Sequence, residues 1–232
     1  QDVCDGFRHC VRSGDDEKPC ELESCPSLCE CAGYAYSCDI KPNTTHISLP
    51  NQARSIIVHG LSNIQIFYNS KYYSNLIYLD ISTGEIDEIH DGMFLYQNSL
   101  KYISFYGNFI KSVHKNTFLG LKILLYLILS YNSVTNIGQG CFDHLESLQI
   151  ARYDHMLIEH MEEYIFLKSQ HLQELDLSYN KITAINAKHF RGLIAREILK
   201  LDNNDITSFT YDCLSELLTL RFLNISQCEI VC

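Results

Sequence analysis

Apolar residues recur along this chain every 24 residues, in blocks that begin at 75, 99, 123, 147, 171 and 195, with a partial block from 219. Apolar and polar residues alternate near the start of each block, which predicts a short strand with one buried face. A fixed period predicts that the strands stack in parallel, because one unit alone cannot bury its apolar side. The clearest block, residues 171–193, carries Leu172, Leu175, Leu177, Asn180 and Ile182.

Equivalent positions of successive blocks form columns, which separates a repeat from a chance run of leucines. The first apolar column is leucine in every block except one, where Arg196 stands. The L-x-x-L-x-L-x-x-N-x-I arrangement is typical of a leucine-rich repeat. It predicts an α/β solenoid, a leucine-rich repeat horseshoe with a parallel concave sheet. Its asparagine column holds Asn108, Asn132, Asn180 and Asn204, with Gly84, Met156 and Cys228 in other blocks.

We expect each of these asparagines to turn inward and to bond backbone groups of its turn, since buried polar groups need partners. Turns that lack the asparagine should be held less well. Residues 51–74 hold apolar pieces without a clear register and predict one or two irregular opening repeats. The repeat region therefore covers 51–232, with six regular repeats over 75–218 and a partial repeat over 219–232.

The polar strand positions should point outward and lie side by side on the concave face. One such row begins with a tyrosine stripe, Tyr78, Tyr102 and Tyr126, which we interpret as a ligand-binding surface because aromatic residues favour interfaces. Later blocks place an acidic cluster there, which would suit a basic peptide. Both features also have explanations that involve no ligand. Tyrosine is common in strands because of its strand propensity, and charged residues on an exposed sheet face are often simply solvated. The acidic cluster comprises Asp154, Glu174, Asp176 and Asp202.

Composition limits the classes of partner and the cellular compartments that suit this chain. A net charge of −10 over 232 residues argues against a nucleic acid partner. The sequence contains no run of about 18 apolar residues, so it predicts no membrane-spanning helix. Eleven cysteines indicate an oxidising compartment, seven of them within the first 38 residues. Asn43 and Asn224 begin glycosylation triplets, and a glycan on Asn224 would obstruct the C-terminal end of the concave face.

Four cysteines, Cys25, Cys29, Cys31 and Cys38, stand just ahead of the repeats. Close spacing could hold zinc, but at the open end of a secreted solenoid two capping disulfides are the better interpretation. The spacing resembles the N-terminal cap of extracellular leucine-rich repeat proteins. We assign residues 21–50 to this cap, and the resemblance implies the pairs Cys25–Cys31 and Cys29–Cys38.

Residues 4–20, CDGFRHCVRSGDDEKPC, are similar to the second half of an LDL-receptor class A module, which we place at 1–20. The resemblance implies a Cys4–Cys20 disulfide and calcium ligands Asp5, Asp16 and Glu17, since calcium takes six to eight oxygen ligands. His9 replaces an expected aspartate, so calcium should bind weakly or not at all. The alternative is an acidic disulfide loop without metal. The module also leaves Cys10 without a partner, and we expect the chain to begin within it.

Four further cysteines lie in the repeats. Cys141 and Cys213 share a column three repeats apart, about 14 Å at ordinary strand spacing, which exceeds the ~7 Å limit for a disulfide. Each should be a buried free thiol that packs as a small apolar residue. Cys228 should behave likewise, and Cys232 has no assignable partner.

No catalytic pattern stands out. His155, His160 and His171 lack a metal spacing, and EHMEEY at 159–164 is not the H-E-x-x-H of zinc proteases. Neither a phosphate-binding loop nor a nucleophile elbow occurs. We therefore interpret the protein as a non-enzyme.

The order of parts, a class A module, a cysteine cap and leucine-rich repeats, resembles the ectodomain of relaxin-type G-protein-coupled receptors. The resemblance implies a receptor on the extracellular side of the plasma membrane whose acidic cluster meets basic side chains of an insulin-like peptide. A transmembrane domain would follow residue 232 and engage a G protein. The rival is a Toll-like or matrix-type leucine-rich repeat protein of immunity or adhesion, with the module-like piece as a spacer. The sequence does not identify the ligand or the oligomeric state.

Overall fold

The computed structural model describes residues 25–40, 49–63, 70–195, 197–207, 212, 217 and 219–229. Several of the expected features lie outside these residues: the proposed calcium ligands Asp5, Asp16 and Glu17, the neighbouring His9, and the proposed Cys4–Cys20 disulfide. So do Cys10, Asn43, Cys213 and Cys232.

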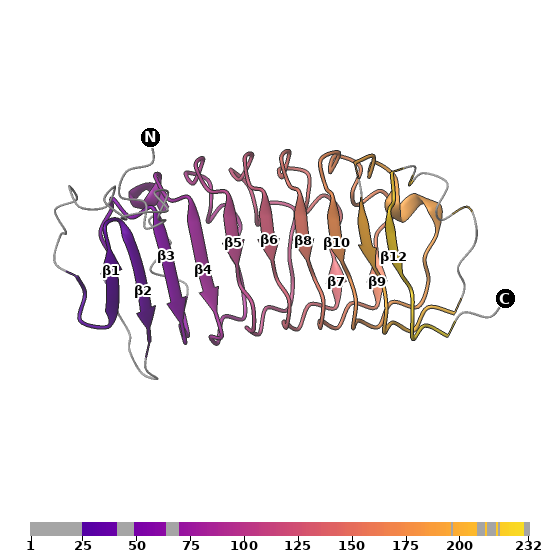
Figure 1. Cartoon of the computed structure of the whole chain (residues 1–232), viewed down its shortest axis with the longest axis horizontal. Coiled ribbons are helices and arrows are strands. Elements are labelled where there is room, and N and C mark those ends of the chain that lie inside the picture. The colour runs from indigo at the N-terminus through magenta and orange to yellow at the C-terminus, as the bar shows by residue number, and fades with distance from the viewer. Residues whose placement is uncertain are drawn as a thin grey trace, which may run out of the picture.

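The strands of the main sheet lie side by side along the long axis of the molecule (Figure 1). The sheet runs in the order β1, β2, β3, β4, β5, β6, β8, β10, β11, β12. Every neighbouring pair from β2 onward is parallel. The strands are β1 (Cys29–Ala32), β2 (Ala35–Asp39), β3 (Ser55–His59), β4 (Tyr78–Ser82), β5 (Tyr102–Ser104), β6 (Tyr126–Ile128), β8 (Ile150–Arg152), β10 (Glu174–Asp176), β11 (Ile198–Lys200) and β12 (Phe222–Asn224).

The register follows the sequence period. Tyr78 pairs with Tyr102 and Tyr102 with Tyr126, and the same 24-residue step continues to Phe222 on β12. The leucine columns are buried, as alternation requires. On the opposite side of the core, Phe94, Phe118, Phe142, Phe166 and Phe190 are at most 1% exposed. The predicted solenoid of stacked parallel strands is confirmed.

The α/β class is wrong, because the described residues contain no α-helix. The segments opposite the sheet return by turns, by a two-stranded sheet of β7 (Asn136–Ile137) and β9 (His160–Met161), and by the 3-10 turns η3 (Ser70–Tyr73) and η4 (Ala187–Phe190). Glycines interrupt these segments. At Gly120, φ is +105°, outside the range of a right-handed helix, and an added Cβ would lie 2.3 Å from the Phe94 carbonyl oxygen, so the position requires glycine.

The N-terminal cap is a hairpin. Strand β1 pairs antiparallel with β2, and disulfides join Cys25 to Cys31 and Cys29 to Cys38, the pairing that the resemblance implies. Strand β2 then pairs in parallel with β3, which gives the irregular opening region one strand. The hairpin thus covers the open end of the hydrophobic core. Its residues Tyr36 and Cys38 are 2% and 0% exposed.

The asparagine column ties each turn to the preceding repeat. Asn132 Nδ2 donates to the carbonyls of Phe105 and Leu129, at 2.9 and 2.8 Å, and Oδ1 accepts from the Ile110 N–H at 2.9 Å. Asn108, Asn180 and Asn204 make the equivalent bonds. Where Cys228 replaces asparagine, its thiol still reaches the Leu201 carbonyl at 3.4 Å.

The residue before each of these positions adopts a left-handed backbone conformation. These residues are Thr83, Gly107, Tyr131, His155, Tyr179, Asn203 and Gln227, with φ between 53° and 66°. Most side chains disfavour this conformation. The conformation also occurs where Gly84, Met156 or Cys228 follows, so the stacked turns hold it with or without an asparagine.

We expect Asn132→Ala to lower the free energy of unfolding by on the order of 3 kcal/mol, since it leaves several buried backbone groups without partners. Thermal or urea unfolding measures this. The exposed Asn116→Ala serves as the matched control and should change stability little. Equal effects of the two substitutions would contradict the role of the column.

Turn η4 provides a pH-dependent contact. Asn186 Oδ1 accepts from the Lys188 N–H, and His189 Nδ1 accepts from the Asn186 N–H at 3.1 Å, which forms a capping box. Burial lowers the pKa of His189, more than the nearby Glu163 and Glu162 raise it. A protonated Nδ1 also could not accept this bond.

Because the folded pKa of His189 lies below the unfolded value of about 6.5, the unfolded chain takes up the proton first. This contribution to stability is therefore complete above pH ~6.5 and is lost as the pH falls. We expect His189→Gln, which can keep the capping box but does not titrate, to reduce the fall in Tm between pH 7.5 and pH 5.5. Identical falls in both proteins would rule out the contact as a source of pH dependence.

Candidate ligand-binding face

The tyrosine stripe lies on neighbouring strands of the concave face. Tyr78 and Tyr102 stack with ring centroids 4.2 Å apart and an angle of 5°, whereas Tyr126 lies 6.1 Å from Tyr102 at 38°. Burial raises the pKa of Tyr78, and its contacts with Tyr102 and Asp80 raise it further. The hydroxyl of Tyr78 therefore stays neutral, and the stripe presents uncharged aromatic side chains.

A second aromatic row lies at the carboxyl ends of the strands. We call Tyr106, Tyr131, His155 and Tyr179 the aromatic rim. His155 is sandwiched between Tyr131 and Tyr179, with centroid separations of 4.1 and 4.2 Å and angles of 9° and 12°. Tyr106 contacts Tyr131 at 5.0 Å. The sequence interpretation missed this row, although the column just before the asparagines contains Tyr131, His155 and Tyr179.

A groove of ≈ 440 Å³ lies on the concave face, with lining residues on or next to β3, β4, β5, β6 and β8. Tyr102, Tyr106 and Tyr126 form its aromatic lining, and Ile128 and Ile150 add apolar surface. The stripe and the rim thus both contribute to one hollow. Its size falls within the range of ligand sites, roughly 300–1,000 Å³.

Polar groups complete the groove. Ser82 donates to Asp80 and shares a hydrogen bond with Ser104, whose hydroxyl lies 3.2 Å away. Arg152 lines the far end. His59 also lines the groove, and its Nδ1 is buried without a hydrogen-bond partner among the described residues.

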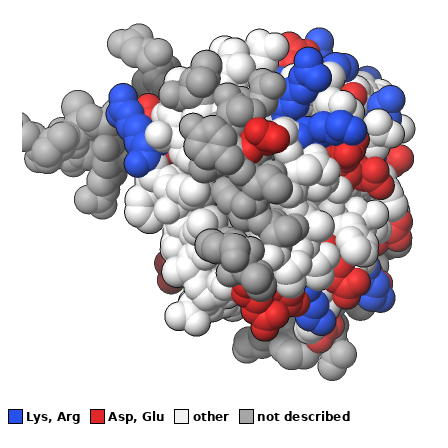
Figure 2. Space-filling view, turned by 90° about the vertical axis from the view of Figure 1, so that its right-hand side faces the viewer, with Lys and Arg blue, Asp and Glu red and all other residues white. Residues whose placement is uncertain are grey.

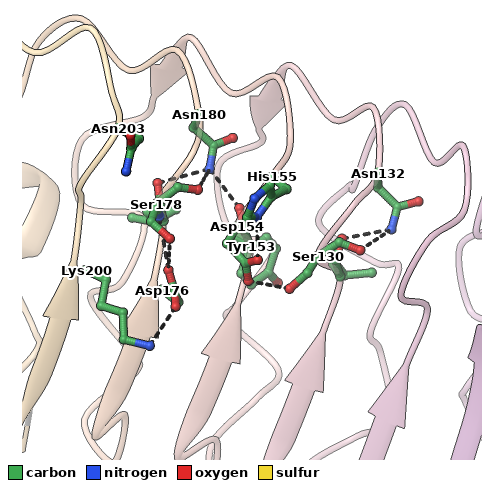
Figure 3. A network of polar contacts seen from close by, with 12 residues as sticks. Ser130, Asn132, Tyr153, Asp154, His155, Asp176, Ser178, Asn180, Lys200 and Asn203 are labelled. Atoms are coloured by element: carbon green, nitrogen blue, oxygen red, sulfur yellow. Dashed lines mark hydrogen bonds and ion pairs between the residues drawn. The ribbon is translucent and has the colours of Figure 1, made fainter. Parts of the chain in front are cut away.

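The acidic cluster is less exposed than the sequence pattern predicts. Figure 3 shows its polar contacts, which join neighbouring repeats. Asp176 is 6% exposed and Asp202 is 9% exposed. Lys200 Nζ lies 2.9 Å from Asp176 and 3.7 Å from Glu174, and Arg152 lies 3.3 Å from Glu174. Cations of adjacent strands therefore neutralise half of the cluster.

The remaining carboxylates have polar contacts as well. Asp154 accepts from the Ser130 hydroxyl at 2.5 Å and lies 2.9 Å from His155 Nδ1. Asp202 Oδ2 accepts from Asn203, while Oδ1 is buried without a partner among the described residues. Burial alone would lower the pKa of Lys200, but Asp176 and Glu174 raise it overall, so this lysine stays charged. The cluster is a salt-bridged network rather than a free acidic patch.

Positive and negative side chains also lie next to each other at the C-terminal end of the stack. Figure 2 looks onto the end of the stack that carries β12, and its coloured residues include Lys and Arg next to Asp and Glu. Asn224 lies on β12, where its Oδ1 accepts from the backbone N–H and the hydroxyl of Ser226. The glycosylation triplet is thus on the sheet, at one end of the concave face.

The other expectations concern cysteines, metals and membranes. Cys141 is a buried free thiol, as expected, and Cys228 is a half-buried one. Burial raises the pKa of both. Within the described residues, no group of three or more His, Cys, Asp or Glu side chains could hold a metal ion. The helical turns in the described parts are too short and polar to cross a membrane.

Comparisons with known proteins agree with this geometry. A family model described as leucine rich repeat matches residues 106–150, 154–205 and 170–230, just over half of the chain. No curated protein matches. Solved structures of the same fold include a complex of TLR13 with ssRNA13, with 22% identity over 75% of this chain and a TM-score of 0.59. A leucine-rich repeat protein of Leptospira interrogans has 20% identity over 79% and a TM-score of 0.65.

The chain spans 29% of the TLR13 chain and 47% of the Leptospira protein. At these identities the likeness shows the fold alone.

The network around Lys200 yields a stability prediction. Lys200→Met should lower the free energy of unfolding by about 1–2 kcal/mol, because the buried Asp176 loses its cation. Lys122→Met is the matched control, since its pair with Glu146 is exposed at both ends and 3.8 Å long, and it should change stability by less than about 0.5 kcal/mol. Chemical unfolding of both variants measures the difference. Equal free energies of unfolding in the two variants would show that the network around Lys200 does not stabilise the fold.

Proposed function

This chain belongs to the leucine-rich repeat family, and from that premise we propose that it is the ligand-binding part of an extracellular receptor. The observation that carries the proposal is the groove on the concave face, which combines aromatic, apolar and polar side chains on adjacent strands. Solenoids use such extended faces for binding. The two disulfides of the cap support an oxidising, extracellular compartment. As a binding scaffold, the chain needs no catalytic group.

We further propose the finer assignment, a relaxin-type G-protein-coupled receptor that captures a basic insulin-like peptide. It is supported by the resemblance of residues 1–38, including calcium ligands Asp5, Asp16 and Glu17. Its transmembrane domain and G protein belong to the full receptor. In this proposal Asp154 is the first contact, because its partners are Ser130 and His155 rather than a lysine or arginine.

A ligand arginine would then compete with Lys200 and Arg152 for Glu174 and Asp176. Arginine can make two parallel hydrogen bonds to a carboxylate, which favours the exchange over a single ammonium contact. A glycan on Asn224 would restrict access from the β12 end. The peptide would therefore lie over β8 and β10, between the glycan and the tyrosine stripe.

The rival proposal is a Toll-like or matrix-type protein of immunity or adhesion. The similarity to the fold of TLR13 supports it. The net charge of −10 opposes an RNA ligand for this chain.

Binding of a relaxin-like peptide to the full chain tests the finer proposal. The triple variant Asp154→Asn, Glu174→Gln and Asp176→Asn keeps side-chain shape and removes charge. We expect it to weaken binding by about tenfold or more and to flatten the salt dependence of the dissociation constant. Surface plasmon resonance at two salt concentrations measures both effects.

The matched control replaces three exposed carboxylates outside the sheet, in Asp87→Asn, Glu88→Gln and Glu146→Gln. This control should bind like the original chain. Unchanged affinity in the first triple variant, with an unchanged Tm, would overturn the proposed role of the acidic cluster.

A further inference from the structure

The groove differs in charge from the neighbouring acidic cluster. Its charged lining residues are one carboxylate, Asp80, and one guanidinium, Arg152, so their charges balance. Asp80 accepts a hydrogen bond from the Ser82 hydroxyl, and Arg152 forms an ion pair with Glu174. A groove with this lining gives little attraction to a strongly charged partner.

Two aromatic side chains that line the groove, Tyr106 and Tyr126, are partly exposed and are not stacked in parallel on another ring. Tyr106 and Tyr126 are 39% and 37% exposed, and each is tilted against its aromatic neighbour, by 52° and 38°. Tyr78 and Tyr102, by contrast, cover one another in a near-parallel stack. An aromatic face carries partial negative charge, so it attracts weakly positive C–H groups. Tyr106 and Tyr126 therefore suit a ligand with flat C–H surfaces.

The polar lining is rich in groups that both donate and accept hydrogen bonds. Hydroxyls of Ser82 and Ser104 are linked to Asp80 at the floor. Arg152 supplies further donors, and the Asp80 carboxylate supplies acceptors. A ligand with several neighbouring hydroxyls would satisfy such a surface, because hydroxyls also donate and accept.

We propose that this groove binds a neutral pyranose oligosaccharide, with sugar faces on Tyr106 and Tyr126 and sugar hydroxyls on Asp80 and Arg152. Flat C–H faces, many hydroxyls and no charge are properties of gluco-configured, β-linked sugars. The groove volume of ≈ 440 Å³ admits a short chain of them. The site adjoins the acidic cluster through the ion pair of Arg152 with Glu174, but it does not depend on peptide capture.

Calorimetric titration of the full chain with chitotriose and cellotriose tests this assignment. We expect saturable binding of at least one of them at millimolar or lower concentration. Tyr106→Ala and Tyr126→Ala should each weaken it by about tenfold or more. Tyr126→Phe keeps the ring face and should retain affinity within about threefold, which separates ring stacking from a folding defect.

Tyr96→Ala is the matched control, because Tyr96 is 48% exposed but does not line the groove. It should bind the sugars like the original chain. Absence of binding by both sugars would overturn the proposal, as would equal affinity in the Tyr126→Ala and original chains. Preference for sulfated oligosaccharides or for a peptide at the same groove would also overturn it. Failure of the acidic-cluster variants to alter peptide affinity would leave this result untouched.

Discussion

The buried turn after each strand is the constraint on which the rest of this structure depends. Its backbone groups are out of reach of water and must find partners inside the protein. In four repeats an asparagine supplies them, with one amide that bonds its own turn and the preceding one. Successive strands are thereby held in a common register, which places side chains of one column next to each other.

The same constraint shapes the binding face. The residue before the asparagine column takes a left-handed conformation in each repeat, whether or not an asparagine follows. Tyr131, His155 and Tyr179 occupy three such positions and stack. Repeats without the asparagine keep the conformation, at Thr83, His155 and Gln227, so the stacked units impose it even where the amide is missing.

The sequence period sufficed to predict the strand register and the buried columns, because both follow from the 24-residue spacing. It could not predict the convex side, which in the described residues returns by turns, short strands and 3-10 turns instead of α-helices. The acidic cluster was identified correctly as a set of neighbours, but its salt bridges depend on how far Lys200 and Arg152 reach across strands. The groove depends on ring tilts at Tyr106 and Tyr126, which a residue pattern does not contain.

The stacked rim also bears on how the solenoid bends. Its ring centroids are 4.1 and 4.2 Å apart, closer than the roughly 4.8 Å between neighbouring strands. Bending that spreads β6, β8 and β10 apart would separate the rings and lose their contacts, while bending that brings them together is soon resisted by ring thickness. The rim therefore acts as a brace of fixed length along one edge of the sheet, and it stiffens the middle of the array against changes of curvature.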